Sequence, residues 1–458
     1  MGVALRGLSR LTEAVAALRK AASIPGAGAA VWQNLGSALS ADGQHAEAAD
    51  ALRTAAAMAP SDGETHNALG NSLVAIGQRS AAQAAYRRAI QCCPDSAVFH
   101  TNLGILLART GASEAAMGSF EDAIAQDASY VDAYTHLGLV LRACGHVQPA
   151  VATWQRGLSV RPTPEAWLNL AVALLELGHV TAGVQNLRNL LGVFPDDVPA
   201  LLALAGALVG LDEHAAAKRR YTEALDRAPG HPEALHFLDA LQDRAPARAP
   251  ASYVRTLFDG YASRFDQHLV GELGYRTPQR LAELIAAVHP GPLGRVCDLG
   301  CGTGLMGALL AERCDHLQGI DLSGEMIAQA ERKGHYDALH LGDIEAVLAT
   351  LGAQDLLVAT DVVIYIGDLS GLFAQAAASL VPGGLLALTT EHIDGEGWRL
   401  LSSGRYAHSA TAIAVLAEAH GLVVLREAVA PIRQERGAWL DGGLYVLRTV
   451  GSGQKSSG

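Results

Sequence analysis

The chain has 458 residues, enough for two or three domains, and half of its residues are hydrophobic, which excludes a largely disordered protein. Its net charge of −12 argues against a protein that binds nucleic acid, because such proteins need a basic surface. The sequence has no run of about 18 uncharged apolar residues, so we expect no membrane span. The six cysteines form no Cys-x-x-Cys pair, and we expect reduced thiols, a cytoplasmic location and no bound metal.

A period of about 34 residues runs through the first half of the chain. Within each period a leucine precedes a small residue, a second small residue follows twelve positions later, and a large residue follows after four more. The leucine and the first small residue are Leu35-Gly36, Leu69-Gly70, Leu103-Gly104, Leu137-Gly138, Leu170-Ala171 and Leu204-Ala205. The small residue allows a second helix to approach the first, and the large residue fills the space beside it. Proline ends most periods, because it stops one helix before the next turn.

This pattern resembles the tetratricopeptide repeat (TPR), including the signature Trp32-x-x-Leu35-Gly36. We expect six full repeats over residues 29–230, the second helix of an incomplete repeat at 8–25, and a closing helix at 231–242. The resemblance implies a TPR domain over residues 1–242 that forms an α-solenoid.

The concave face of such a solenoid predicts a binding groove for a protein or peptide partner. The positions expected to face inward change from small and polar to apolar along the array. They are Gln33, Ser37, Ser40, Asn67, Asn71, Val74, Thr101, Ile105, Ala108, Thr135, Leu139, Arg142, Leu168, Val172 and Leu175. An apolar concave strip also suits packing against the second half of the chain or against a second copy, and both alternatives stay open.

The repeat pattern stops at residues 243–252, where alanine and proline predict a short, stiff linker. From 253 to 449, apolar strands alternate with helical segments. The expected strands are 294–299, 316–321, 338–341, 355–360, 384–390, 422–429 and 443–448. We therefore expect an α + α/β protein, in which the solenoid precedes a seven-stranded, mostly parallel, Rossmann-like sheet with helices on both faces. Residues 450–458 predict a flexible tail.

The strongest motif, Asp298-Leu299-Gly300-Cys301-Gly302-Thr303-Gly304, ends one expected strand and opens a helix. Its glycines allow the backbone to approach a ligand closely, and a helix N-terminus offers free N–H groups. Asp298 suits a ligand with an ammonium group and would repel a pyrophosphate. Leu305 stands where a dinucleotide fingerprint has glycine, which disfavours a nicotinamide-dependent oxidoreductase. The motif resembles motif I of class I S-adenosylmethionine-dependent methyltransferases.

Asp321, Asp343 and Asp361 end three further expected strands at the same edge of the sheet. A single aspartate there is more often a helix N-cap, but four together favour a ligand site. Asp321 suits the two ribose hydroxyls of S-adenosylmethionine, and the resemblance implies that Asp343 accepts a hydrogen bond from the adenine amino group. The residues expected to contact the cofactor are Asp298, Gly300, Cys301, Gly302, Thr303, Gly304, Asp321, Leu322, Met326, Asp343, Ile344, Asp361, Val362 and Tyr261.

Methyl transfer from a sulfonium requires alignment of donor and acceptor, exclusion of water, and removal of a proton from a hydroxyl or ammonium acceptor. We expect His408 to be the base, with His392 as second candidate, although a lone histidine on a loop is more often a surface residue. Tyr261 and Tyr365 suit contact with the sulfonium charge, or they pack in the core or lid.

Two further features concern the acceptor. Arg405 and Arg433 would either orient an acidic acceptor or pair with Glu391 or Glu435. The aromatic segment 253–269 resembles the lid of bacterial methyltransferases that carry TPRs, and it either closes over a ligand or forms a static cap.

The chain as a whole resembles these bacterial TPR-containing methyltransferases, with a methyltransferase domain similar to those of ubiquinone and menaquinone biosynthesis. Further shared motifs are Tyr365-Ile366-Gly367-Asp368-Leu369 and Gly404-Arg405-Tyr406-Ala407-His408-Ser409. The resemblance implies transfer of a methyl group from S-adenosylmethionine to an unidentified acceptor, with S-adenosylhomocysteine as product and the repeats docking the acceptor or a partner protein. The alternative is an adaptor whose methyltransferase-like domain binds the cofactor without efficient turnover.

Overall fold

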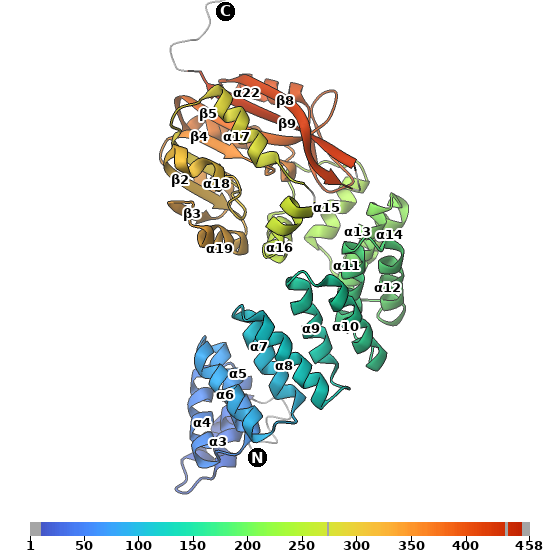
Figure 1. The fold of residues 1–458 in the computed structure, drawn as a ribbon, viewed down its shortest axis with the longest axis vertical. Coiled ribbons are helices and arrows are strands. Elements are labelled where there is room, and N and C mark those ends of the chain that lie inside the picture. The colour runs from blue at the N-terminus through green and yellow to red at the C-terminus, as the bar shows by residue number, and fades with distance from the viewer. Residues whose placement is uncertain (1–10, 273, 436–437, 451–458) are drawn as a thin grey trace, which may run out of the picture. The chain divides into compact units, whose positions relative to one another are not determined.

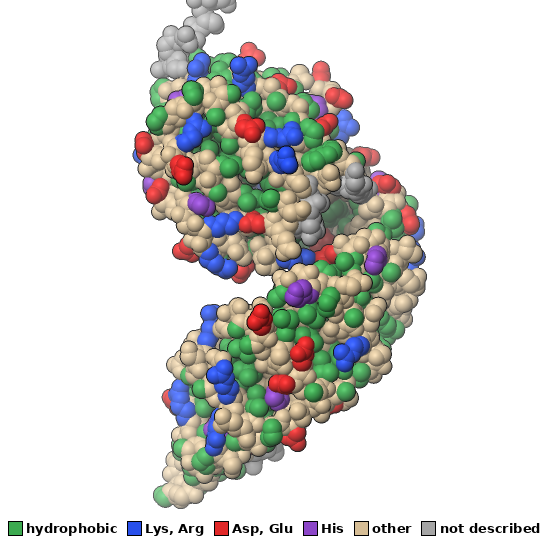
Figure 2. Space-filling model, in the orientation of Figure 1, with side chains coloured by type: hydrophobic (Ala, Val, Ile, Leu, Met, Phe, Trp, Pro, Cys, Tyr) green, Lys and Arg blue, Asp and Glu red, His purple; other side chains and the backbone are tan. Residues whose placement is uncertain are grey.

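The computed structural model describes residues 11–272, 274–435 and 438–450 and contains two compact units, Met1–Ala200 and Leu201–Gly458 (Figure 1). The predicted tail and the first residues of the helix predicted at 8–25 lie outside the described residues. Within the described ranges, no helix combines the length and the hydrophobicity that crossing a bilayer requires. Acidic and basic side chains are intermixed on the face shown in Figure 2.

Unit 1 consists of helices that pack in consecutive antiparallel pairs, which confirms the predicted TPR architecture. The helices are α2 (Leu11–Ala22), α3 (Ala29–Ala41), α4 (His45–Met58), α5 (Gly63–Ala75), α6 (Arg79–Cys92), α7 (Ala97–Arg109), α8 (Ser113–Gln126), α9 (Val131–Ala143), α10 (Val147–Val160), α11 (Pro164–Glu176) and α12 (Val180–Val193). The pattern continues across the unit boundary with α13 (Val198–Gly210), α14 (His214–Arg227) and α15 (Pro232–Leu241).

The turn inside each helical pair contains one residue in the left-handed region. Glycine takes this position in the first five repeats, with φ between 75° and 81° at Gly43, Gly77, Gly111, Gly145 and Gly178. Asp212 takes it in the sixth repeat with φ 59°, because a short polar side chain tolerates this conformation better than most others.

The repeating small and large residues meet across each pair, as the sequence predicts. A Cβ added to Gly36 would lie 2.4 Å from Leu52, and one added to Gly138 would lie 2.4 Å from the ring of Trp154. Leu52 and Trp154 are fully buried. Glycine is therefore required wherever the large side chain lies directly against the backbone of the first helix.

Replacing Gly138 by alanine should lower the free energy of unfolding by about 1–3 kcal/mol, because the buried Trp154 ring has no space into which to move. Gly118 in α8 is the matched control, since no atom lies within 4 Å of a Cβ added there. Gly118→Ala should be neutral or stabilise by up to about 1 kcal/mol, because alanine has the higher helix propensity. Urea denaturation followed by circular dichroism measures both variants, and equal losses would contradict the argument from close approach.

Unit 2 contains one nine-stranded sheet among the described residues, with a path of β3-β2-β1-β4-β5-β7-β6 and with β9 pairing both β5 and β8. The strands are β1 (Gly294–Leu299), β2 (Cys314–Asp321), β3 (Ala338–Leu341), β4 (Gln354–Ala359), β5 (Leu380–His392), β6 (Trp398–Leu400), β7 (Tyr406–His408), β8 (Leu422–Glu435) and β9 (Ala438–Thr449). Strands β1 to β5 are mutually parallel along this path, whereas β9 is antiparallel to β5 and β8. The seven predicted strands are confirmed, and the short strands β6 and β7 are additional.

Helices cover both faces of this sheet, as predicted. They are α17 (Thr277–Val288), α18 (Gly307–Leu310), α19 (Gly324–Lys333), α20 (Ile344–Leu348), α21 (Ser370–Ser379) and α22 (Ala410–Ala419). Helices α17 and α18 bury Leu281, Ile285 and Leu310 in one core, whereas α20, α21 and α22 contribute to another. The strand order reverses between β1 and β4, so the carboxyl ends of these two strands border a natural ligand crevice.

The segment predicted as a linker is bound to the sheet domain by backbone hydrogen bonds. The carbonyl oxygen of Ala247 accepts from the amides of Gly367 (2.7 Å) and Asp368 (2.9 Å), and the Ala249 amide donates to the Tyr365 carbonyl (2.9 Å). The sequence pattern does not predict this pairing. A paired segment of about three residues is too short to show the alternation of apolar and polar side chains that marks a strand. The proposed domain boundaries at 242 and 253 stay a prediction.

Candidate functional site

A cavity of about 510 Å³ opens where the crevice between β1 and β4 is expected, a volume typical of small-molecule sites. Many of the residues predicted to form the site line it. They are Tyr261, Gly300, Gly302, Asp321, Leu322, Met326, Asp343, Ile344, Asp361, Val362 and Tyr365. Folding brings them together from the ends of four strands and from α16 (Ala251–Tyr261).

The glycine loop after β1 presents bare backbone to the cavity. Gly300 and Gly302 have φ of 70° and 53°, which a side chain rarely permits. A Cβ added to Gly302 would meet only the edge of Phe265, at 4.0 Å, so it would occupy cavity space. Glycine at 302 thus keeps open a cradle that fits the extended chain of a ligand.

Asp321 joins this loop to the end of β2. One carboxylate oxygen accepts from the Gly302 amide at 2.9 Å, and the other accepts from the Ser323 amide at 2.8 Å. Burial raises the pKa of Asp321, and the backbone donors from Ser323 and Gly302 partly offset that rise. The hydrogen bonds fix the carboxylate at the cavity wall, where two adjacent hydroxyls of a ligand would reach it.

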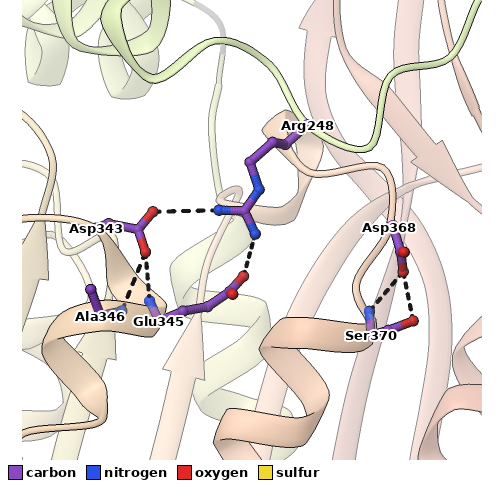
Figure 3. Close-up of polar contacts among 6 residues, drawn as sticks. All are labelled: Arg248, Asp343, Glu345, Ala346, Asp368 and Ser370. Atoms are coloured by element: carbon purple, nitrogen blue, oxygen red, sulfur yellow. Dashed lines mark hydrogen bonds and ion pairs between the residues drawn. The ribbon is translucent and has the colours of Figure 1, made fainter.

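Asp343 immediately precedes α20 (Ile344–Leu348), and its two carboxylate oxygens have different partners (Figure 3). Oδ1 accepts from the amides of Glu345 (3.1 Å) and Ala346 (3.3 Å), which makes it an N-cap. Oδ2 lies 3.5 Å from the guanidinium of Arg248, which also binds Glu345 at 2.5 Å. Asp343 is thus both a helix cap and part of the cavity wall.

Four predicted cofactor contacts do not line the cavity: Asp298, Cys301, Thr303 and Gly304. Asp298 is 1% exposed, and the Tyr336 hydroxyl donates to it at 2.7 Å. Cys301 is buried, and a Cβ added to Gly319 would lie 2.8 Å from its sulfur. Thr303 donates to Asp266 at 2.5 Å. These residues support the glycine loop from behind.

Burial raises the pKa of Asp298 to about 7. The hydrogen bond from Tyr336 acts against this rise, and the charge of Asp321 adds to it. Asp298 therefore gains or loses its charge near neutral pH, at a buried position in β1.

Charged side chains form one part of the cavity wall, which we call the polar end. Arg405 and Arg433 both contact the same oxygen of Glu391, a residue 1% exposed, which confirms one of the two pairings considered for them. Arg433 also lies 3.7 Å from Asp361. Both arginines remain part of the cavity lining.

Asp361 has φ 56°, an unusual value for a residue other than glycine. Thr389 stabilises this conformation: its hydroxyl accepts from the Asp361 amide at 2.9 Å and donates to the carboxylate at 3.1 Å. Backbone strain of this kind concentrates at functional sites. Burial and the charge of Asp361 raise the pKa of neighbouring Tyr275, and burial raises that of Tyr365 to about 12, so both hydroxyls are protonated donors.

The structure does not bring either histidine candidate to the cavity. His408 is fully buried in β7, where its Nε2 lies 3.0 Å from the Gly367 carbonyl, and burial lowers its pKa. His392 lies 3.6 Å from Asp394. The placement of His408 suits a neutral imidazole that holds the 366–367 turn to β7, because a base must reach the proton that it removes.

The predicted lid is mostly a cavity wall. Phe258, Tyr261 and Phe265 line the cavity, and the Tyr261 and Phe265 rings pack edge to face at 5.3 Å. Tyr253 instead packs against His236 of α15, with ring centres 5.2 Å apart. The hydroxyl of Ser323 donates to Asp259 at 2.5 Å, so polar contacts also bind this segment to the loops below it.

Sequence reasoning missed Arg248, Glu345 and Tyr275 as cavity residues. Arg248 lies in the segment that reads as a linker, and no local pattern marks it. Glu345 lies two positions after Asp343, and this proximity is the one feature of the sequence that could have indicated that Glu345 lines the cavity. Within the described ranges, no group of three or more His, Cys, Asp or Glu side chains is arranged to hold a metal ion.

Comparison with known proteins agrees with this division of the chain. Residues 296–384 match a family model described as a methyltransferase domain, and residues 29–62 and 67–131 match two models of the tetratricopeptide repeat. The chain is 39% identical over 120 residues to a malonyl-[acyl-carrier protein] O-methyltransferase of Chlorobium phaeovibrioides, covering 24% of this chain and 46% of that protein. It is 38% identical over 109 residues to a trans-aconitate 2-methyltransferase of Acidovorax, covering 23% and 42%.

The chain thus spans less than half of the length of either relative. Among solved structures, magnesium protoporphyrin IX methyltransferase of Synechocystis aligns with 43% of this chain and 96% of its own, at 20% identity and a TM-score of 0.34.

Asp298→Asn should make the stability of the protein less dependent on pH. A carboxyl whose pKa is raised to about 7 on folding, from an unfolded value near 4, stabilises the fold below about pH 4 and loses this contribution as pH rises to about 7. An amide has no such loss, so the free energy of unfolding of the variant relative to wild type should rise by on the order of 1–4 kcal/mol between pH 4 and pH 7. Chemical denaturation across this range measures the difference, and a constant difference would contradict the assignment.

Proposed function

We propose that this chain, a tetratricopeptide-repeat protein with a class I methyltransferase domain, transfers the methyl group of S-adenosylmethionine to an acidic acceptor. The observation that carries the cofactor assignment is the convergence of the open Gly302 cradle, Asp321 and Asp343 on one cavity within the methyltransferase match. This site and these relatives favour an enzyme over an adaptor that only binds the cofactor.

The cavity residues divide naturally among the parts of the cofactor. We assign Asp321 to the ribose hydroxyls, and Asp343 with Ile344 to the adenine. Leu322 and Met326 supply apolar surface between these two groups. We assign Tyr261 and Phe265, which also line the cavity, to contact with the sulfonium, because aromatic rings stabilise a positive charge. The cofactor itself supplies an activated methyl group, so these residues chiefly orient it and exclude water.

The acidic acceptor is inferred from the polar end of the cavity. Arg405 and Arg433 place two guanidinium groups there, and such groups bind carboxylates through charge-assisted hydrogen bonds. The described lining residues include no histidine, lysine or cysteine, and the lining carboxylates Asp321, Asp343 and Asp361 already accept hydrogen bonds. A carboxylate acceptor needs no base, because it is already deprotonated at neutral pH. The two relatives, by their names, also act on acids, malonyl-[acyl-carrier protein] and trans-aconitate.

We further propose that the TPR array docks the acceptor or the protein that carries it. The predicted groove positions Asn71, Val74 and Ile105 line a hollow of about 160 Å³ together with Arg109. Leu139, another groove position, is 37% exposed. A surface that combines amide, apolar and basic groups suits an extended peptide segment. The cytoplasmic location stays a prediction that accompanies this proposal.

Asp321→Asn should weaken binding of S-adenosylhomocysteine by about 10- to 100-fold, because hydrogen bonds to a charged group contribute about 1.5–3 kcal/mol. Asp315→Asn, an exposed aspartate on the same strand β2, is the matched control and should bind as wild type does. Isothermal titration calorimetry measures the affinities. Unchanged binding by Asp321→Asn would show that the ribose assignment is wrong.

Arg433→Gln should lower the rate of methyl transfer to carboxylic acids by about 10- to 100-fold, equivalent to about 1.4–2.8 kcal/mol, while leaving cofactor affinity within about twofold. Arg426→Gln, an exposed position on the same strand β8, is the control. A panel of carboxylic acids and their primary amides, assayed by release of S-adenosylhomocysteine and mass of the methyl ester, tests the acceptor class. Equal transfer to the amides would refute an acidic acceptor.

Leu139→Asp should weaken turnover of the natural acceptor but not that of a small acid that reaches the cavity directly, since it alters only the groove. Val160→Asp, in the second helix of the same repeat and 43% exposed, controls for an added surface charge. The ratio of the two rates is the measurement, and an unchanged ratio would argue that the repeats do not dock the acceptor.

A further inference from the structure

A short segment between the last repeat helix and the sheet domain forms part of the cavity wall. We call residues 246–249 the strap. Its backbone pairs with residues 365–368 through the three hydrogen bonds described above, and Arg248 forms an antiparallel bridge with Ile366. The Tyr406 hydroxyl adds a bond to the Pro246 carbonyl at 2.8 Å. The strap is therefore held against residues 365–368, and its residues Arg248 and Ala249 line the cavity.

The side chain of Arg248 points toward Asp343 and Glu345 (Figure 3), and all three residues line the cavity. Its two terminal nitrogens contact Asp343 at 3.5 Å and Glu345 at 2.5 Å. These partners are partly exposed, so each ion pair contributes little to stability by itself. Arg248 contacts one oxygen of Asp343, and the start of α20 holds the other.

The strap also continues directly from α15, the closing helix of the repeats. Nε2 of His236 lies 2.7 Å from the Gly404 carbonyl oxygen, and the Phe237 ring lies so close that a Cβ on Gly404 would meet it at 2.8 Å. Phe237 stacks on Tyr221 of the preceding helix at 5.4 Å. Gly404 immediately precedes Arg405, which lines the polar end of the same cavity. Helix α15 therefore contacts the residue before Arg405, and the strap follows it in the chain.

We propose that the strap is a working part of the cofactor site, in which Arg248 is a positioning residue for Asp343, and that cofactor binding and the docking of α15 stabilise one another. This inference rests on the cofactor site proposed above. Two sites that share one ordered segment are coupled in both directions, so a ligand that requires the strap in place also favours the docked helix. A change in the packing of α15 would then alter the affinity for the cofactor through the strap and the contacts of α15 with Gly404.

Three variants of the full chain test the role of Arg248. Arg248→Gln should weaken binding of S-adenosylhomocysteine by about three- to tenfold, and Arg248→Lys should recover part of the loss because it restores the charge but not the two-pronged contact. Arg244→Gln is the matched control: Arg244 lies just before the strap, pairs with Asp239 at 3.6 Å and does not line the cavity. Calorimetric affinities in Arg248→Gln equal to wild type, or an equal loss in Arg244→Gln, would overturn the proposal.

The coupling to α15 has its own measurement. Phe237→Ala should loosen the helix and weaken S-adenosylhomocysteine binding by about two- to fivefold, although residue 237 does not line the cavity. Phe194→Ala, outside unit 2, removes a ring of the same size and should leave the affinity unchanged. In wild type, S-adenosylhomocysteine should slow hydrogen exchange of the amides in α15 and of Ala249. Exchange there that is the same with and without ligand would overturn the coupling.

Asp321→Asn distinguishes a failure of the proposed cofactor site from a failure of the strap proposal alone. If wild type fails to bind S-adenosylhomocysteine, the cofactor assignment is wrong and the strap proposal falls with it. If wild type binds and Asp321→Asn weakens binding, while Arg248→Gln and Phe237→Ala do not, the cofactor site stands and only the strap proposal is refuted.

Discussion

The hydrogen bond from the Gly302 amide to Asp321 joins the loop after β1 to the end of β2, and the amides of Gly300 and Cys301 reinforce this link by donating to the Ile320 carbonyl. It requires a loop that turns sharply after β1, which Gly300 and Gly302 allow through their positive φ values. It also requires the loop to be supported from behind, where Asp298, Cys301 and Tyr336 are packed. Where Gly300 and Gly302 line the cavity, the loop presents backbone without a side chain.

Burial has different consequences for Asp298 and Glu391, two carboxylates that lie behind the cavity wall. Behind the glycine loop it raises the pKa of Asp298, because one hydrogen bond from Tyr336 only partly replaces water around the carboxylate. At the polar end, Glu391 is just as buried but has two arginines at one oxygen. A buried carboxylate with such partners is held in place by them, and they in turn are positioned at the cavity wall.

Several contacts hold the strap in place, and each of them contributes little to stability by itself. The ion pairs of Arg248 are too exposed to hold a chain segment against the entropy of its freedom. The strap stays in place because its backbone hydrogen bonds and the aromatic packing of His236 and Phe237 act together. The strap and α15 both belong to the compact unit that contains the cavity.

The sequence by itself determined the features that depend on local spacing. The recurring Gly and large residues, such as Gly138 with Trp154, required close helix pairs, and the Asp298–Gly304 motif with aspartates at strand ends required a ligand edge. Most residues expected in the cavity are there, because the ends of parallel strands necessarily meet.

Only the tertiary structure decided which residues face the cavity and which support it. His408 carries the expected chemistry, but its strand lies inside the sheet, and burial excludes it from the cavity. Arg248 carries no local signal, yet backbone pairing with residues more than 100 positions later brings it to the wall. Spacing along the chain predicts contacts within an element or between strand ends. Contacts between segments that are far apart in the sequence depend on the packing of the complete domain, so local spacing does not predict them.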